Sequence, residues 1–498
     1  MEIPFKKTPL EFDQRVLFPS NIFDLLAQDH DSRVLWDLIG QLDTSELEKK
    51  YSVRGQNAYH PRLIARILIY AYSQGVFSAR QIERRCSEDL GFMYVSEMNC
   101  PNFRVLCDFR KNNREFFKSC FKQTVVLAME TGLACLGHVS IDGSKFKANT
   151  SKHKAMSYKR LKEKEKELAE AIEELTRKAT VCDDEEDQEF KDKTGYEIPE
   201  ELKEQTKRLE KIKDAKKALE EREQKLHPGK PIEDRKQISF ADQDAMLMGK
   251  KGKYEYAYNP QISVDKDKQV IVGQHVSQNP NDYGEVEPAL QEIKDTTDKE
   301  PEKVSLDNGY FSGENLKTLE DSEIDCYVAT GKGEDSDGSG VGSGSGKLEK
   351  SVFTYDPEKD CFRCPEGQDL PLKTQGSDGR RYYQGDKKAC KKCRLRSRCS
   401  SSKKGAPRTI TADEHEEFRT RMREKMRSPE AKEIYRLRKI IVEPAFGQIR
   451  NLGFNGFSVR GFKAVCGEFS LMCAVHNLKK IAKHGLRAQP CPESGIFT

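Results

Sequence analysis

Alternating apolar and polar residues recur through the middle of the chain and predict β-strands. The runs HVSID (138–142) and KVSLD (303–307) alternate in this way, and each ends in an aspartate. The runs YAYNPQISVD and KQVIVGQHVSQ (256–278) flank a short polar turn, as a hairpin requires. Helical patterns at 288–293 and 313–319, and a strand-like run at 324–330, follow. The predicted order is strand, strand, strand, helix, strand, helix, strand.

Helical periodicity governs the first 135 residues instead. The run PRLIARILIYAYSQG begins with proline and ends at glycine, and SARQIERRCSEDLGF then begins with a capping serine. Arg84 and Arg85 lie on the predicted outward face of this second helix. Two interpretations are open for the region. It is either a helix-turn-helix-like module whose arginines contact DNA phosphates, or a plain helical support domain.

Two long charged helices are predicted within residues 150–236. The segments 159–179 and 200–226 are rich in Lys, Glu, Ala and Leu, and an acidic stretch at 181–190 is expected to form the loop between them. The pattern indicates an antiparallel helical hairpin inserted into the strand-rich region. Solvated structural helices are the simpler interpretation, and a role in dimerisation or in clamping DNA is the alternative.

The stretch YRLRKIIVEPAFGQIR (435–450) predicts an amphipathic helix that carries Glu443 among basic residues. Pro444 removes a backbone donor, so a kink is expected there. Apolar positions between 469 and 478 predict a closing core helix, in which His476 is interpreted as a packed or surface histidine rather than a metal ligand. Residues 331–347 have the composition of a flexible Gly/Ser linker, and residues 485–498 are interpreted as a tail.

Composition narrows the class of protein. The chain has 498 residues, a net charge of +4 and a pI of about 8.2, so any nucleic-acid surface must be local. The first residues lack the apolar core of a signal peptide, and no run has the length of a membrane span. We therefore expect a cytoplasmic protein without a membrane partner. Its 15 cysteines then indicate free thiols or metal ligands.

Three acids form the first candidate site. Asp142 and Asp307 follow strand-like runs, and Glu443 lies on the basic helix. Acids at strand ends often cap helices or turns, and a lone Glu among cations is often a surface ion pair. The same three carboxylates are also the layout that holds two Mg²⁺ ions for phosphoryl transfer. Asp242 and Asp244 are competing acids, ranked lower because no strand precedes them.

Basic residues accompany the first acid. Lys145 and Lys147 alternate with Phe146, so both are expected on the face opposite the phenyl ring, where they can reach a phosphate backbone.

Cysteines form the second candidate site. Cys361 and Cys364 make one C-x2-C pair, Cys390 and Cys393 make another, and Cys399 follows. Such pairs can present thiolates to one tetrahedral zinc ion, and unrelated free thiols are the alternative. Four thiolates would make the zinc structural, because no position stays open.

The motifs IDGSKFKAN (141–149), LDNGYFSGENL (306–316) and the helix around Glu443 resemble those of bacterial insertion-sequence DDE transposases of the IS4-type superfamily. That helix in the family carries Tyr, two residues, Arg, three residues, Glu, six residues and Arg. The chain has Tyr435, two residues and Arg438, then four residues before Glu443, and Arg450 six residues later. The middle gap is one residue longer, so Lys439 is an alternative to Arg438 in the arginine's role.

The resemblance implies a mixed α/β protein. Its parts are an RNase H-like mixed-sheet catalytic core, an N-terminal all-α DNA-binding domain, a long helical-hairpin insertion and a small Cys-rich, zinc-ribbon-like insertion. The expected organisation is a helical domain at 1–135, the first part of the core at 136–330, the linker and Cys-rich insertion at 331–430, the core helices with the catalytic Glu at 431–484, and the tail at 485–498.

The resemblance also implies a mechanism. Asp142, Asp307 and Glu443 would hold two Mg²⁺ ions, for which Mn²⁺ can substitute, with the first acid bridging both. Water would attack the scissile phosphate at a terminal inverted repeat, and the freed 3′-hydroxyl would attack target DNA. The DNA-binding residues would be Tyr435, Arg438, Lys439, Arg450, Lys145, Lys147, Arg84 and Arg85.

The family pattern also selects among the cysteines. It points to Cys364, Cys390, Cys393 and Cys399 as zinc ligands and leaves Cys361 spare. We further expect a homodimer on double-stranded DNA, in a bacterial, nucleoid-associated setting. Two other classes stay open: a domesticated, non-catalytic DNA-binding protein, and an RNase H-like nuclease that cuts without joining strands.

Overall fold

The computed structural model describes residues 21–51, 58–151, 155–189, 200–250, 253–330, 348, 350–376, 379–400, 402 and 406–484. Its contacts divide the chain into two compact units, residues 1–109 and 110–498. The sequence analysis ended its helical domain at residue 135, whereas helix α7 (Arg114–Glu130) lies in the second unit. The predicted linker at 331–347 and the tail at 485–498 lie outside the described residues. None of the described helices is long and apolar enough to cross a bilayer.

The first unit is helical. It contains η1 (Ile22–Leu25), α1 (Asp31–Gly40), α2 (Ser45–Glu48), α3 (Pro61–Ser73), α4 (Ala79–Glu88) and α5 (Leu90–Val95), and it ends within α6 (Phe103–Asn112). Helix α3 is its centre, because every residue of that helix except Arg62 is buried. Pro61 begins α3, where its missing N–H costs no helical hydrogen bond.

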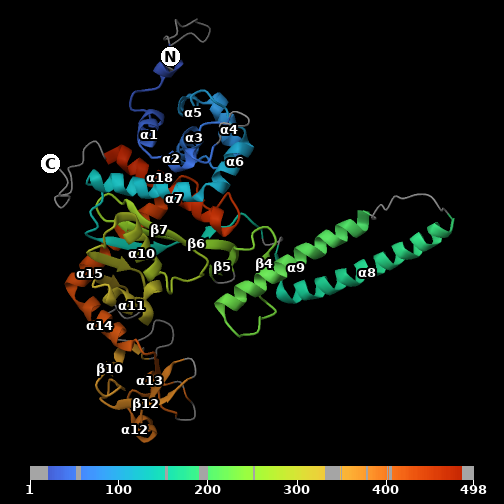
Figure 1. Cartoon of the computed structure of the whole chain (residues 1–498). Coiled ribbons are helices and arrows are strands. Elements are labelled where there is room, and N and C mark those ends of the chain that lie inside the picture. The colour runs from blue at the N-terminus through green and yellow to red at the C-terminus, as the bar shows by residue number, and fades with distance from the viewer. Residues whose placement is uncertain are drawn as a thin grey trace, which may run out of the picture. The chain divides into compact units, whose positions relative to one another are not determined.

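A seven-stranded mixed sheet is the centre of the second unit (Figure 1). Its strands are β1 (Val139–Gly143), β2 (Phe146–Lys147), β5 (Met246–Lys250), β6 (Lys253–Asp265), β7 (Ile271–Ser277), β8 (Lys303–Leu306) and β9 (Asp325–Val328). The long β6 pairs antiparallel with β1, β2, β5 and β7. Strands β1, β8 and β9 are parallel neighbours. The predicted hairpin is β6 and β7. The predicted order of strands and helices is confirmed, except that β5, which precedes β6, was not predicted.

Helices cover both faces of the sheet (Figure 1). Helix α10 (Val286–Thr297) and helix α18 (Phe462–His484) pack on opposite sides of β7. Two consecutive residues of β7, Gly273 and Gln274, show this, because each faces a different helix. A Cβ on Gly273 would lie 2.9 Å from the Ile293 side chain of α10, whereas Gln274 Nε2 donates a 2.8 Å hydrogen bond to Ser470 Oγ of α18. Helix α7 packs along α18, and α11 (Gly313–Asp321) packs against α10.

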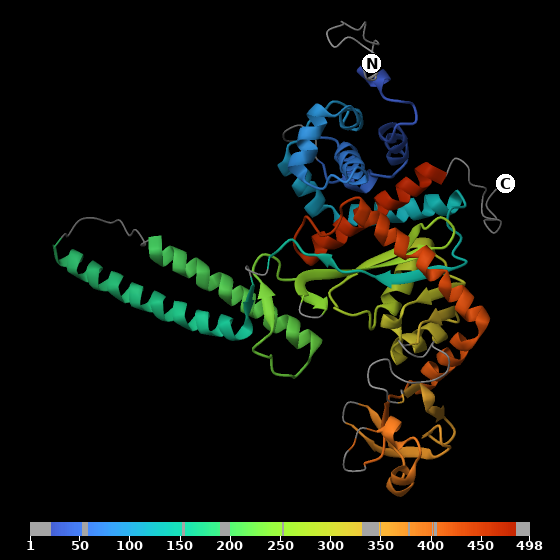
Figure 2. The same cartoon turned by 180° about the vertical axis from the view of Figure 1, so that it is seen from behind.

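A helical hairpin extends from the core between β3 (Ala155–Ser157) and β4 (Gln237–Ser239), which pair at its base (Figure 2). It consists of α8 (Tyr158–Glu189) and α9 (Glu200–Leu226). The acidic stretch was expected to be a loop from residue 181, and this expectation is wrong for 181–189, which continue α8. A small apolar cluster joins the base of the two helices: Leu161, Ile212, Ala215, Leu219 and Ile238.

The Cys-rich insertion is a five-stranded antiparallel sheet of β10 (Thr354–Asp356), β11 (Cys361–Arg363), β12 (Asp369–Gln375), β13 (Arg381–Gln384) and β14 (Thr409–Ala412). Two short helices, α12 (Lys387–Lys392) and α13 (Arg396–Cys399), lie between β13 and β14. The insertion has its own buried cluster, which includes Phe362, Leu370, Tyr383 and Ile410.

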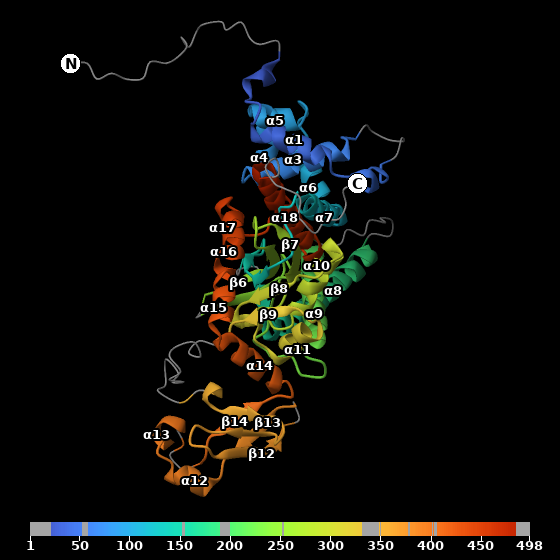
Figure 3. The ribbon, with the colours of Figure 1, turned by 90° about the vertical axis from the view of Figure 1, so that its left-hand side faces the viewer.

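From the insertion the chain continues through α14 (Glu416–Arg427), α15 (Pro429–Arg436), α16 (Arg438–Ile441) and α17 (Glu443–Asn451), which follow one another along the sheet (Figure 3). The helix predicted for 435–450 is therefore broken at Leu437 and Val442. Pro444 occupies the first turn of α17, so the expected kink is confirmed as a break just before it.

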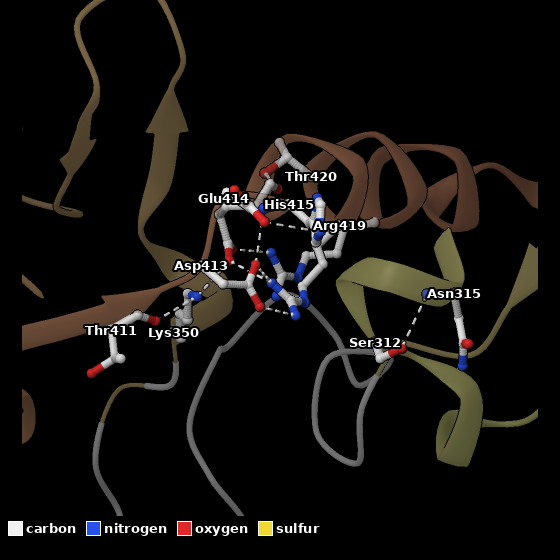
Figure 4. A network of polar contacts seen from close by, with 11 residues as sticks. Ser312, Asn315, Lys350, Thr411, Asp413, Glu414, His415, Arg419 and Thr420 are labelled. Carbon is white, nitrogen blue, oxygen red and sulfur yellow. Dashed lines mark hydrogen bonds and ion pairs between the residues drawn. The ribbon is translucent and has the colours of Figure 1, made fainter. Parts of the chain in front are cut away.

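A buried carboxylate joins the insertion to the start of this helical series. Glu416 is 1% exposed and accepts from Lys350 at 2.7 Å, Arg423 at 3.0 Å and Arg419 at 3.3 Å. Figure 4 shows Lys350 and the neighbouring pair in which Arg419 Nη2 lies 2.6 Å from Asp413 Oδ2. We call Glu416, Lys350, Arg419 and Arg423 the Glu416 cluster.

Candidate active site

Asp142 and Asp307 lie at the same edge of the sheet. Strands β1 and β8 are parallel neighbours with Ile141 opposite Leu306, so the aspartate that follows each of these residues emerges at the same end. Asp307 Oδ1 accepts from the Gly309 amide at 2.7 Å and caps the short helix η3 (Asn308–Tyr310). The capping interpretation is thus correct for Asp307, and its second oxygen is left for other partners.

Glu443 follows Arg438 by five residues. Leu437 and Val442, which separate α16 from α15 and α17, both have right-handed helical backbone angles. Helix α16 packs against β1, and Glu443 follows as the first residue of α17.

The three acids meet at one guanidinium group. Arg438 Nη2 lies 2.8 Å from Asp142 Oδ2 and 4.0 Å from Asp307 Oδ2, and its Nη1 lies 3.8 Å from Glu443 Oε1. We call these four residues the Arg438 cluster. The sequence analysis proposed Arg438 as a DNA-binding residue, but its side chain is only 8% exposed and contacts the acids.

Exposure increases outward across the Arg438 cluster. The side chain of Asp142 is 18% exposed, that of Asp307 39% and that of Glu443 54%. Burial raises the pKa of Asp142 to about 6, with Arg438 acting in the opposite direction. Burial acts to lower the pKa of Arg438, but the acids, Asp142 foremost, outweigh it and raise that pKa. The site therefore combines two solvent-open acids, Asp307 and Glu443, with the more deeply placed ion pair of Asp142 and Arg438.

A fourth acid, Asp282, lies beside the cluster and was not found from the sequence. It lies between β7 and α10, and its Oδ1 accepts from Asn259 at 2.9 Å and from Gln261 at 2.8 Å. A Cβ on Gly143 would lie 2.6 Å from Asp282 Oδ1, and one on Gly309 would lie 2.9 Å from Oδ2. Gly143 follows Asp142, and Gly309 lies two residues after Asp307. Because neither glycine has a side chain, both leave room for the Asp282 carboxylate. In the sequence Asp282 follows a Pro-Asn pair and is typical of a turn.

Basic residues predicted to bind DNA border the acids. Lys145 and Lys147 flank buried Phe146, as alternation predicted, and Lys147 Nζ lies 3.1 Å from Glu255. Arg450 Nη2 donates to Ser144 Oγ at 2.6 Å and its guanidinium lies 5.2 Å from the centre of the Phe146 ring. Lys439 is exposed and Tyr435 is half-buried.

The remaining predicted residues have local partners. In the first unit, Arg84 lies 3.5 Å from Glu88 and Arg85 lies 3.6 Å from Asp89, one helical turn away. The competing acids serve the fold instead. Tyr258 donates to Asp242 at 2.9 Å, and the Phe462 amide donates to Asp244 at 2.8 Å, which fixes the start of α18. His476 is buried, and its Nε2 lies 2.8 Å from the Gln269 carbonyl oxygen, as expected of a packed histidine.

Four of the five cysteines gather at one place in the insertion. A pocket of about 280 Å³ is lined by Cys364, Cys390, Cys393 and Cys399, together with Glu366, Gln368, Arg408 and apolar side chains. Cys361 lies outside this pocket, buried in β11, and its charged neighbours are Asp369, Asp356, Lys359 and Arg363. Burial raises the pKa of the Cys390 and Cys399 thiols, and the neighbouring cysteines act in the same direction.

The carboxylates and the clustered thiols can be compared with the ligands that the predicted Mg²⁺ and zinc ions require. Across the described parts of the chain, no three His, Cys, Asp or Glu side chains are arranged so that they could hold a metal ion. At the acids, Arg438 lies where the carboxylates converge. Its buried Nε has no hydrogen-bond partner. By type, three carboxylates around one cationic group fit a hard divalent cation, and four thiols fit zinc.

Two family models match the chain. The one described as "Transposase DDE domain" matches residues 363–482, a range that contains the four clustered cysteines, Arg438 and Glu443. The one described as "Transposase domain (DUF772)" matches residues 20–112, most of the first unit. Asp142 and Asp307 lie in neither range. No curated protein and no solved structure matches the chain. Both models describe transposase domains, and together they support an insertion-sequence DDE transposase.

Proposed function

We propose that this transposase cleaves DNA at terminal inverted repeats and transfers the cleaved strand, with Asp142, Asp307 and Glu443 as its catalytic acids. One observation carries the proposal: three carboxylates from β1, from the end of β8 and from α17 converge on the same guanidinium. The order β7-β6-β1-β8-β9, with β7, β6 and β1 antiparallel and β1, β8 and β9 parallel, supports an RNase H-like core. The assignment to the IS4-type branch stays a prediction.

The acids would hold two Mg²⁺ ions, which when bound supply Lewis-acid activation of the attacking oxygen and stabilise the leaving one. The protein itself contributes by holding the three acids in fixed positions. Asp142 is held by the sheet, Asp307 by its cap on η3 and Glu443 by the first turn of α17. Asp282 fixes Gln261, which accepts the hydroxyl proton of Tyr310 beneath the acids. This rigid support favours in-line attack on a phosphate, because little reorganisation is needed at the moment of reaction.

DNA would lie across the face that carries Lys145, Lys147 and Arg450. A groove of about 420 Å³ begins at Lys147 and is lined by Asn149, Thr150, Gly456 and Arg460. Arg460 Nε donates to the Asn149 carbonyl at 2.9 Å, so that guanidinium is held at the groove. Lysine, arginine and backbone amides in a polar groove are the groups that contact phosphates. Tyr435, Lys439 and, in the helical unit, Arg84 and Arg85 are the further DNA contacts that we propose.

Zinc, if bound by Cys364, Cys390, Cys393 and Cys399, would be structural and would fix the insertion that leads into α14. We further propose that two copies act as a homodimer, because each end of the element needs its own site, and that the protein acts at the bacterial nucleoid. A non-catalytic DNA-binding protein would have no need of solvent-open carboxylates beside phosphate-binding groups, so we rank that alternative second. The third, a nuclease that cuts without joining, shares the same acids.

The test is Mg²⁺-dependent cleavage of a plasmid that carries the element's inverted repeats. Asp142→Asn, Asp307→Asn and Glu443→Gln should each bind the repeats and cut at least about 10³-fold more slowly, since each removes charge that stabilises the reaction. Asp244→Asn is the matched control and should cut like the wild type. Wild type that binds repeats but never cuts under Mg²⁺ or Mn²⁺ would favour the binding protein. Cutting without joining of a pre-cleaved end would favour the nuclease.

A further inference from the structure

Arg438 is an unusual member of its cluster, because one cation serves three acids. Its side chain is more than nine-tenths buried, and its Nη2 lies 2.8 Å from Asp142 Oδ2. Its Nε is buried without a hydrogen-bond partner. Its terminal nitrogens form ion pairs with the carboxylates of Asp142, Asp307 and Glu443. This geometry favours a role for the positive charge itself.

Without a cation, the three carboxylates would repel one another, and the buried Asp142 would be the least favourable of them. Arg438 neutralises part of this charge. A divalent cation bound by the same acids would need Asp142 Oδ2 at a distance of about 2.1 Å, as Mg²⁺ requires. With the guanidinium only 2.8 Å from the same oxygen, two positive groups would lie close together and would repel strongly.

We propose that Arg438 is the counter-cation of the metal-free site and that a divalent cation must displace its guanidinium to bind. The inference rests on the proposed function and adds a regulatory step to it. Arg438 begins the single helical turn α16, which Leu437 and Val442 separate from α15 and α17. A displaced guanidinium is then free for a phosphate, the anion whose geometry it matches. Metal binding and DNA binding would therefore favour each other.

Mn²⁺ binding to the DNA-free protein tests whether Arg438 opposes binding of a divalent cation. In calorimetric titrations Arg438→Gln should bind Mn²⁺ roughly tenfold more tightly than wild type, because no cation has to leave. Arg436→Gln is the matched control: it removes the same charge from the exposed end of α15 and should bind like wild type. Arg438→Lys, which keeps a shorter and better hydrated cation, should lie between the two.

Labelling of the wild-type protein tests displacement directly and needs no variant to fold. Phenylglyoxal modifies accessible arginines, and peptide mass mapping then reports each site. Without metal, Arg438 should be protected and Arg436 labelled. Saturating Mn²⁺ should raise the labelling of Arg438 severalfold and leave that of Arg436 unchanged. This readout separates displacement from simple repulsion at a distance.

The outcomes distinguish this proposal from the proposed function. If wild type and Arg438→Gln bind Mn²⁺ equally, or if Arg438 stays protected in saturating Mn²⁺, displacement is wrong while the acid site stands. If neither protein binds Mn²⁺, the metal site and the displacement both fail. If Asp142→Asn abolishes the binding and Arg438→Gln strengthens it, both are supported.

Discussion

The Glu416 cluster and the Arg438 cluster use the same kinds of side chain in opposite ratios. In the first, one buried acid is surrounded by three cations. In the second, one buried cation is surrounded by three acids, and two of these are substantially open to solvent. The clusters lie at the start of α14 and at α16 and α17, so one run of short helices connects them.

The opposite ratio of acids to cations indicates that charge stabilises the fold in the Glu416 cluster and serves function in the Arg438 cluster. Glu416 has its charge fully compensated and its oxygens occupied, which is what a buried carboxylate requires for stability. The Arg438 cluster has uncompensated negative charge and keeps it exposed, where water can solvate it. Such an arrangement contributes little to folding, and it offers free oxygens to an incoming cation.

Cys390→Ser should remove zinc altogether from the purified protein, since three thiolates hold the ion far less well than four. Metal analysis by mass spectrometry would measure the zinc content. Cys361→Ser is the control and should keep it, because Cys361 lies outside the pocket of the other four. Wild-type protein purified without zinc, or equal zinc in both variants, would show that these cysteines are not its ligands.

Glu416→Gln should lower the free energy of unfolding by about 3 kcal/mol, because it removes the buried charge that Lys350, Arg419 and Arg423 share. Urea unfolding followed by circular dichroism would measure the change. The neighbouring Glu417→Gln removes the same charge from an exposed ion pair with Arg421 and should change stability by no more than about 0.5 kcal/mol. Equal losses in both variants would mean that burial does not distinguish them.

Gly309→Ala should slow DNA cleavage roughly tenfold, about 1.4 kcal/mol, while leaving the fold intact. Its Cβ would lie 2.9 Å from both Asp282 Oδ2 and Asp307 Oδ1, so at least one acid must shift. Gly447→Ala is the control, because nothing lies within 4 Å of its Cβ and alanine favours the helix. Cleavage unaffected by Gly309→Ala would imply that the acids tolerate displacement.

Sequence alone predicted most strands of the core, among them β1, β6, β7 and β8. The pattern of apolar residues along each strand depends on which of its faces are buried, which is a local property. It also predicted Asp142 and Asp307 as strand-end acids. Glu443 needed the family resemblance, since a lone Glu among bases has many interpretations. The burial of Arg438 and the approach of Asp282 could not be predicted. Both depend on contacts between residues that are distant in the sequence, such as Arg438 with Asp142 and Asp282 with Gly143, which no local pattern contains.

Similar limits apply outside the core. The charged composition of 181–189 satisfies a loop and a solvated helix equally well, and the structure continues α8 through it. The spacing of cysteines alone predicted two pairs and could not separate Cys361 from the rest. The family resemblance left Cys361 spare, and Cys361 is buried in β11, outside the pocket of the other four.

Thermal unfolding with and without Mn²⁺ tests the central claim most directly, that the Arg438 cluster binds a divalent cation and the Glu416 cluster does not. Saturating Mn²⁺ should raise the unfolding temperature of the wild type. It should raise that of Glu416→Gln by the same amount from a lower starting value, and leave that of Asp142→Asn unchanged. An equal rise in Asp142→Asn, or loss of the rise in Glu416→Gln, would contradict the assignment.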